Sequence, residues 1–182
     1  MIHTYKDMKK GQLANLLGSL AIAVSDAQSE AMAVRTSLNA SEMAAVMTLG
    51  TSPGLSIDHL GKILGLSHSA TVRLVAKLAA QGQIARRPRA DRREVGLRLT
   101  AKGRGLRDRL VTARGRVLEG CIASLPAAER AAFGRLVSTL LETLTASRRQ
   151  ADHICRLCDE TVCPLESCPV ERKAVRLETG AP

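Results

Sequence analysis

Aromatic residues are almost absent from this chain, which has no Trp, one Tyr and one Phe in 182 residues. A core without aromatic rings must be built from Leu, Val, Ala and Ile, as a helical assembly can readily do. The scarcity argues against the common single-strand and RNA-binding modules, because these stack bases on aromatic side chains. It argues equally against a sugar-binding platform.

Long apolar runs are also missing. No stretch of about 18 apolar residues occurs, so we expect no membrane-spanning helix. Residues 1–10 mix polar and charged side chains, and no signal-peptide hydrophobic stretch follows them. We therefore expect a cytoplasmic protein with no membrane partner. The length predicts one or at most two domains, with a core that needs no disulfides.

Negative charge is scarce. Lys and Arg total 27 and Asp and Glu total 17, so the formal net charge is +10. Between residues 86 and 116, twelve cations stand against three acids, which places a net charge of +9 in that segment. A solvated surface usually alternates charges of both signs. Such a concentration of one sign indicates a polyanionic partner, most simply nucleic acid.

Apolar periodicity predicts a mainly helical chain with one β-hairpin. A long helix is expected within residues 8–36, and Gly65 with the N-cap Ser67 forms the turn of a helix-turn-helix. Thr100 is the predicted N-cap of the helix after the hairpin. The expected shorter helices span 43–49, 56–64 and 68–81, the strands lie within 84–87 and 94–99, and long helices follow from 101 and after Pro126. The middle of the chain is thus predicted to be a winged helix.

The fold class that follows is mainly α with a small β-hairpin wing, a dimeric winged helix-turn-helix with long N- and C-terminal dimerisation helices. Residues 1–38 would form the N-terminal dimerisation helix and 39–100 the winged helix. Residues 101–150 would form the C-terminal dimerisation helices and 151–182 a cysteine-rich tail. A homodimer is expected because the apolar stripes of the terminal helices are longer than a small winged helix can cover, and because two-fold proteins match two-fold operators.

Double-stranded DNA is the expected partner of the winged helix. A recognition helix over about 68–81 fits the major groove, which is about 12 Å wide, with its N-terminal residues at base edges. The N-terminus of that helix can hold a phosphate, and a basic wing over about 86–98 would reach the backbone or a narrow minor groove. The candidate DNA-binding residues are Ser67, His68, Ser69, Ala70, Arg73, Lys77, Arg86, Arg87, Arg89, Arg92 and Arg93.

Four segments in this order and spacing resemble the MarR family of winged-helix regulators, named for multiple antibiotic resistance. They are Gly65-Leu66-Ser67 with Ser69 and Arg73-Leu74-Val75-Ala76-Lys77-Leu78, then Gly82-Gln83-Ile84-Ala85-Arg86, then Asp91-Arg92-Arg93, and finally Leu99-Thr100-Ala101-Lys102-Gly103. The resemblance covers roughly residues 12–144.

The resemblance implies an obligate homodimer whose terminal helices interlock, with each winged helix bound to half of a pseudo-palindrome. Many members of the family are repressors that a small phenolic or lipophilic ligand, or cysteine oxidation, releases from DNA. By resemblance, Arg93 would be the wing arginine at the DNA. A small-molecule effector is therefore a further expected partner.

Four of the five cysteines lie close together near the C-terminus, as Cys155-x2-Cys158-x4-Cys163-x4-Cys168. In a reducing compartment this clustering favours metal binding or thiol chemistry over structural disulfides. A zinc site with four cysteine ligands, an iron–sulfur cluster, metal-free redox sensing and an inert structural clip are the alternatives. Neither metal would be required for DNA binding.

Three neighbouring features complete this region. His153 could substitute as a ligand, but a lone His at such a position is more often exposed. Pro164 and Pro169 are expected to keep the cysteine segment from continuing as helix. The fifth cysteine, Cys121, lies on the apolar face of a predicted helix, and we expect it to be buried by packing.

These patterns favour a transcription regulator over an enzyme, and the family resemblance implies that it is a repressor. No cofactor-binding glycine pattern and no Ser/His/Asp arrangement occurs. An alternative is a redox or electron-transfer protein that uses the cysteine cluster, with the winged helix as scaffold. A winged helix used only for protein contacts is a third possibility, but it would not need so basic a wing.

Overall fold

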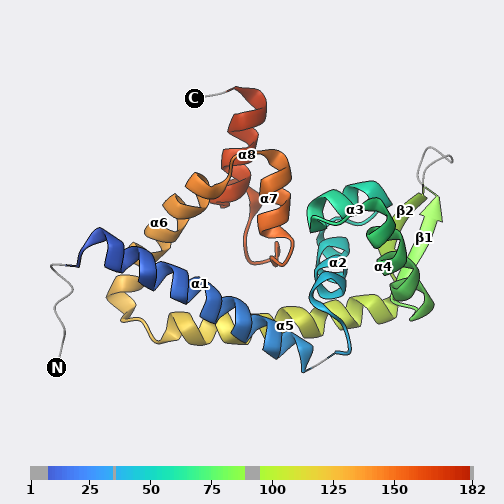
Figure 1. Ribbon diagram of the computed structural model, residues 1–182, viewed down its shortest axis with the longest axis horizontal. Coiled ribbons are helices and arrows are strands. Elements are labelled where there is room, and N and C mark those ends of the chain that lie inside the picture. Colours follow the sequence, from blue (N-terminus) through green and yellow to red (C-terminus); the bar gives the residue numbers. More distant parts are fainter. Residues whose placement is uncertain (1–7, 35, 89–94, 181–182) are drawn as a thin grey trace.

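The computed structural model describes residues 8–34, 36–88 and 95–180. It confirms a mainly helical chain with one two-stranded antiparallel hairpin (Figure 1). The elements are α1 (Lys10–Ala33), α2 (Ala40–Thr51), α3 (Ile57–Leu64), α4 (His68–Ala80), β1 (Ile84–Pro88), β2 (Val95–Leu99), α5 (Ala101–Ala123), α6 (Ala127–Leu144), α7 (Arg148–Cys155), the 3₁₀ helix η2 (Leu165–Ser167) and α8 (Pro169–Thr179). None of the described helices is long and apolar enough to cross a membrane.

Local capping fixes where the helices of the winged helix begin. Asn39 and Glu42 form a reciprocal capping box at the start of α2. The Ser67 hydroxyl accepts a hydrogen bond from the Ala70 amide at the start of α4, and Thr100 caps α5 in the same way. Gly65 ends α3 with φ of 68°, a left-handed conformation that glycine adopts without steric cost. The predicted helix-turn-helix is therefore confirmed.

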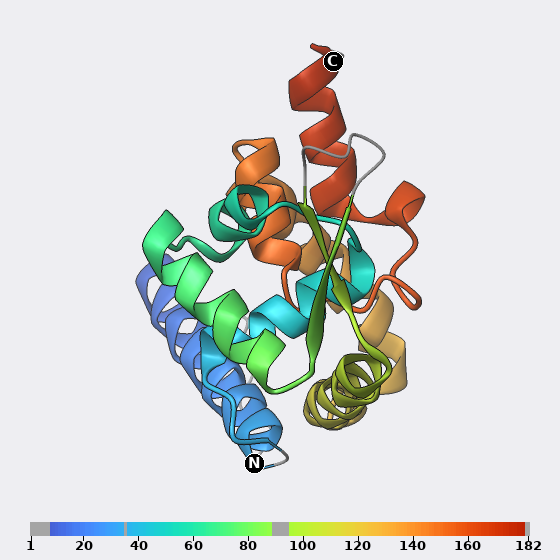
Figure 2. The same cartoon turned by 90° about the vertical axis from the view of Figure 1, so that its right-hand side faces the viewer.

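The wing is tied to the turn before α3. Strands β1 and β2 pair with Ile84 opposite Leu99, and Leu55 adds an isolated bridge to Leu97. Ile84 and Leu97 are buried, so the base of the hairpin belongs to the core. Figure 2 shows the hairpin standing beside α4. The predicted basic turn falls mostly on residues 89–94, which lie outside the described residues.

One apolar core holds the winged helix together, and α2 runs through its centre. Eight consecutive residues of α2, from Glu42 to Leu49, are buried. Leu74 and Val75 of α4 pack against them, as do Leu106 and Leu110 of α5. A helix that is buried on nearly every side needs elements all around it. The rest of the winged helix and α5 form that enclosure.

The long helices outside this core leave much apolar surface uncovered. Helix α1 runs along α5 (Figure 1), yet Met32 is its one buried residue among those described. No residue of α6, described over its full length, is buried. The large apolar side chains left exposed on these two helices are Leu13, Leu16, Leu17, Leu20, Ile22, Leu136, Leu140 and Leu144.

The cysteine-rich tail is more helical than the sequence suggests. Pro164 does precede a break, but Pro169 occupies the first position of α8, where its missing N–H leaves no hydrogen bond unmade. As expected, α7 does not continue as α-helix through the cysteine segment, although Pro169 itself begins a new helix. Arg148 of α7 forms a bidentate ion pair with Glu171 of α8 and a further pair with Glu178. These bonds hold α7 and α8 together, and α8 also packs on α6.

Candidate functional site

Helix α4 presents one polar face to solvent. Its buried residues are Thr71, Leu74, Val75 and Leu78, the face that the sequence predicts. Ser69 and Arg73 lie on the exposed side, while Ala70 is half-buried. An exposed guanidinium at this position is available to a partner in solution.

The N-terminus of α4 is held in a fixed position. The Nδ1 atom of His68 lies 2.6 Å from Oδ1 of Asp58 on α3, and both side chains are largely exposed. The hydroxyl groups of Ser67 and Ser69 lie 3.3 Å apart at the same helix end. His68 thus joins the two helices of the helix-turn-helix at the surface. The candidate residues at this helix end lie together, as the sequence predicts.

Lys77 has a partner that the sequence analysis missed. Its Nζ lies 2.7 Å from Oε1 of Glu42, a carboxylate whose side chain is only 4% exposed. A buried carboxylate needs a counter-charge, and Lys77 reaches over the surface of the core to supply it. Lys77 therefore stabilises the contact between α2 and α4. Nothing in the local sequence marks this pair, because its members are 35 positions apart.

The described part of the wing is basic and open to solvent. Arg86 and Arg87 on β1 and Arg98 on β2 are exposed. Neighbouring residues of a strand face opposite sides of the sheet, so Arg86 and Arg87 place a cation on each face. The other wing candidates, Arg89, Arg92 and Arg93, lie outside the described residues.

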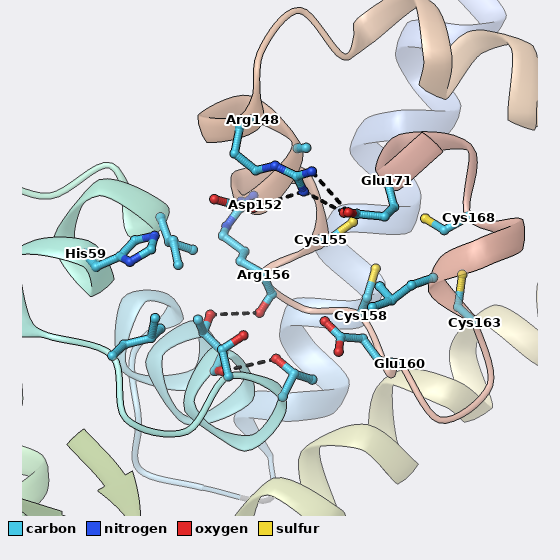
Figure 3. Close-up of a pocket in the computed structure, with 17 residues that line it drawn as sticks. His59, Arg148, Asp152, Cys155, Arg156, Cys158, Glu160, Cys163, Cys168 and Glu171 are labelled. Atoms are coloured by element: carbon cyan, nitrogen blue, oxygen red, sulfur yellow. Dashed lines mark hydrogen bonds and ion pairs between the residues drawn. The ribbon is translucent and has the colours of Figure 1, made fainter. Parts of the chain in front are cut away.

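All four clustered cysteines line one cavity of about 320 Å³ (Figure 3). Cys155 is the last residue of α7, Cys158 and Cys163 lie in the loop that follows, and Cys168 immediately precedes α8. Cys168 is buried, and the other three are half-buried.

The thiols of Cys155 and Cys158 differ in acidity. A hydrogen bond from Cys155 and the nearby charge of Arg114 lower the pKa of Cys158 to about 7. The same hydrogen bond and burial raise the pKa of Cys155. The lowered pKa favours the thiolate of Cys158, and thiolate is the form that binds metals and reacts with oxidants.

The tail docks directly on the winged helix. His153 Nδ1 lies 2.7 Å from the Ile63 carbonyl of α3, and since a carbonyl only accepts, the ring nitrogen donates. The Thr48 hydroxyl of α2 donates to the carbonyl of Arg156 at 3.3 Å. Leu157 packs against the core of the winged helix. The expectation that His153 is simply exposed is wrong, because this long-range contact half-buries it.

Cys121 also differs from the prediction. It is exposed on α5 of the single chain, not buried by packing. The apolar stripe of α5 covers the winged-helix core only in its first turns, where Leu106 and Leu110 are buried. Beyond that point α5 runs past the core (Figure 1), and Cys121 belongs to the last turn of this helix, which ends at Ala123.

Comparison with known proteins identifies the winged helix. The model of the MarR family matches residues 36–94. No curated protein matches the chain. Among solved structures, the MarR family protein Rv2887 of Mycobacterium tuberculosis is 26% identical, with a TM-score of 0.57 over 73% of this chain and 96% of that one.

Two further structures extend the likeness. Rv2887 in complex with DNA is 27% identical, with a TM-score of 0.54 over 68% of this chain and 96% of that one. A MarR family protein from Bacillus stearothermophilus is 24% identical, with a TM-score of 0.67 over 74% of this chain and 94% of that one. The resemblance seen in the sequence is therefore confirmed, and each of these chains leaves at least a quarter of the present one unmatched.

Proposed function

We propose that this chain is a transcriptional regulator of the MarR type, a homodimer that binds a pseudo-palindromic DNA operator and represses transcription. Each protomer inserts α4 into the major groove of one half-site. The wing contacts the flanking backbone or minor groove. The protein acts in the cytoplasm, where bacterial-type operators are accessible.

The observation that carries this proposal is the exposed basic face formed by α4 and the hairpin. Arg73 on α4 and Arg86, Arg87 and Arg98 on the strands are all exposed, and Asp58 is bound to His68. A surface of this kind attracts phosphates, while the N-terminal side chains of α4 are free to meet base edges. Lys77 supports the same face indirectly, because its bond to Glu42 fixes how α4 lies on α2.

The dimer is supported by the uncovered apolar surface on α1 and α6. Leu13, Leu16, Leu17 and Leu20 follow the i, i+3, i+4, i+7 spacing of one helix face and are each about half exposed. A contiguous apolar face of this length marks a protein–protein interface. A second copy of this chain would cover it and would supply the second recognition helix that an inverted repeat requires.

Repression follows from the size of the complex. Two recognition helices one helical turn apart, about 34 Å, place the dimer over a stretch of DNA that a polymerase must also occupy. A small effector, a metal or thiol oxidation at the cavity beneath α3 would release the operator by altering how the winged helix is held. Rv2887 has also been solved in complex with salicylic acid. The cavity of about 320 Å³ in the present chain is large enough for a ligand of that size.

The test begins with a library of duplexes carrying a randomised segment, from which the full-length protein selects its preferred sequence. We expect an inverted repeat whose half-sites are about 10 base pairs apart. On that duplex, R73A should lower affinity by about 1–3 kcal/mol and relax the sequence preference at one position of each half-site. R86A should weaken binding to every duplex and reduce the slope of log affinity against log salt by about 1 for each phosphate that is no longer neutralised.

Arg149 provides a matched control because it is an exposed arginine on α7, away from the wing. R149A should leave both affinity and salt slope unchanged. Unaltered duplex affinity of R73A and R86A would contradict the proposal. It would favour a winged helix that serves protein contacts or acts as a scaffold for a redox site. Transcription in vitro from a promoter carrying the selected operator then tests the sign of regulation.

A further inference from the structure

We propose that Asp58 and His68 together determine one step of base recognition by α4. Asp58 orients the imidazole of His68, and the Nε2 atom of His68 accepts a hydrogen bond from the exocyclic amine of an adenine or a cytosine in the major groove. This inference rests on the proposed DNA binding by α4 and assigns the chemistry of one base contact within it. Asp58 is a positioning residue, because it acts through His68.

His68 lies where a recognition helix meets the bases. It is the first residue of α4, directly after the N-cap Ser67. The Cα–Cβ bonds of a helix tilt toward its N-terminus, so the side chain of a first-turn residue extends past the end of the helix. In a helix-turn-helix, this end of the second helix contacts the base edges. The side chain of His68 is 68% exposed and is therefore open to such a contact.

The hydrogen bond to Asp58 determines which atom of the imidazole remains available. Nδ1 of His68 lies 2.6 Å from Oδ1 of Asp58. An ionised carboxylate can only accept, so Nδ1 donates in this bond. In the neutral ring the second nitrogen, Nε2, then has a free lone pair and accepts. Adenine N6 and cytosine N4 are donors in the major groove, whereas guanine and thymine present only acceptors there.

Close packing of α3 on α4 fixes the two residues relative to each other. The helices approach closely at Gly61 and Thr71, since a Cβ atom at Gly61 would lie 2.7 Å from Oγ1 of Thr71. Thr71 is fully buried, and its hydroxyl donates to the Ser67 carbonyl at 2.9 Å. Asp58 precedes Gly61 by three residues and His68 precedes Thr71 by three, so the pair lies about one helical turn from this contact. An imidazole that is already oriented loses less conformational freedom when it meets DNA.

The charge of Asp58 is unfavourable on a face that binds phosphates. Asp58 is the one acidic residue of α3 and α4, both of which the structure describes in full. A carboxylate near DNA repels every duplex, whatever its sequence. Specificity is a difference between affinities, so a group that repels all duplexes equally and orients one base contact lowers affinity but favours the correct sequence.

The test uses the full-length protein at about pH 8, where an ordinary histidine is neutral, and the duplex that it selects from a randomised library. The base pair that His68 contacts is the one at which H68A loses the preference of the parent protein. The amine-bearing base of that pair is replaced by an analogue without the amine, purine for adenine or pyrimidin-2-one for cytosine. We expect the analogue to weaken binding of the parent protein about fivefold and to change binding of H68A by less than about twofold.

Variants of Asp58 separate orientation from charge. D58A should lose most of the discrimination between the natural base and its analogue, while its affinity for unrelated duplex stays the same or rises, because a repulsive charge is removed. A merely structural defect would instead lower the affinity for every duplex. D58N keeps an oxygen that accepts from Nδ1 of His68 and should retain the discrimination. D108A removes an exposed acid of α5 and is the matched control, which should also retain it.

Three results would overturn the proposal. They are a preference of H68A that equals that of the parent protein at every position, an equal effect of the analogue on both proteins, and equal loss of discrimination in D58N and D58A. A contact at guanine N7, detected by substitution with 7-deazaguanine, would also overturn it, because such a contact requires a donor at Nε2. Failure of the proposed function is distinguishable, since the parent protein would then select no duplex at all. His68 and Asp58 are both exposed, so we expect the variants to fold, and circular dichroism checks this.

Discussion

Truncating two leucines of α1, in the double variant L16A/L20A, should weaken self-association of this protein about a thousandfold. Leu16 is 47% exposed and Leu20 is 50% exposed in the single chain. Full burial of a leucine side chain stabilises by about 1.5–3 kcal/mol, so covering the exposed half contributes about 1 kcal/mol. Each protomer carries both substitutions, so the dimer loses about 1 kcal/mol of association free energy at each of four leucines. The sum of about 4 kcal/mol corresponds to roughly a thousandfold increase in the dimer Kd.

Sedimentation over a dilution series measures this Kd directly. Ile22 supplies the control, because it is 66% exposed and lies about two and a half helical turns after Leu13, on the opposite side of α1. I22A should leave the Kd within a few-fold of that of the unaltered protein. The reasoning is refuted if L16A/L20A sediments as the parent protein does at every concentration, or if the parent protein is itself a monomer at micromolar concentration.

Further predictions concern the packing of α5 and the docking of the tail. G103A should lower the free energy of unfolding by about 1–3 kcal/mol, because the added Cβ would overlap the carbonyl of Gln83. G120A lies on the same helix, and among the described residues nothing beyond its chain neighbours and its own helix backbone comes within 4 Å of the added Cβ. It should raise the free energy of unfolding by up to about 1 kcal/mol, and equal effects of the two variants in denaturant unfolding would contradict this difference. H153A removes the hydrogen bond from α7 to α3, worth about 1 kcal/mol, and should speed amide hydrogen exchange in α7 about fivefold, with R149A as control. Unchanged exchange in H153A would show that this bond does not hold the tail.

The winged helix could be predicted because its signals are local. Each helix start rests on a side chain that bonds the backbone within three residues, as at Asn39, Ser67 and Thr100. The hairpin follows from a change in apolar period after Gly82. The face of α4 that points to solvent follows from helical spacing alone. For these elements the sequence pattern and the tertiary packing favour the same conformation.

What the sequence could not predict depends on contacts between distant positions. Lys77 has the spacing of a solvent-facing residue, but Glu42 draws it to the core boundary. His153 looks like an isolated polar residue until α3 lies beside it. Pro169 has the character of a helix breaker in its local sequence, yet it starts α8, because the first position of a helix tolerates proline. Cys121 looks buried because periodicity marks an apolar face without showing where the covering element ends.

The cysteine cluster lies between these two cases. The spacing of its four thiols marks a site, and the structure brings all four to one cavity. The spacing could not show that the opposite wall of the cavity would come from α2 and α3, about 100 positions earlier in the chain.

The contact of α7 with α3 gives the winged helix a second point of attachment to the rest of the chain. A domain connected at one point can rotate freely about that connection. A domain held at two separate points can rotate only if one of the two contacts breaks or both move together. The winged helix continues into α5 at one end and is held by α7 at another (Figure 1). The orientation of the winged helix is thus fixed in part by α7 and the residues directly after it, which bond to α3 and α2. Removing α7 and the residues after it would leave α4 folded but would remove the second contact that fixes its orientation relative to α5.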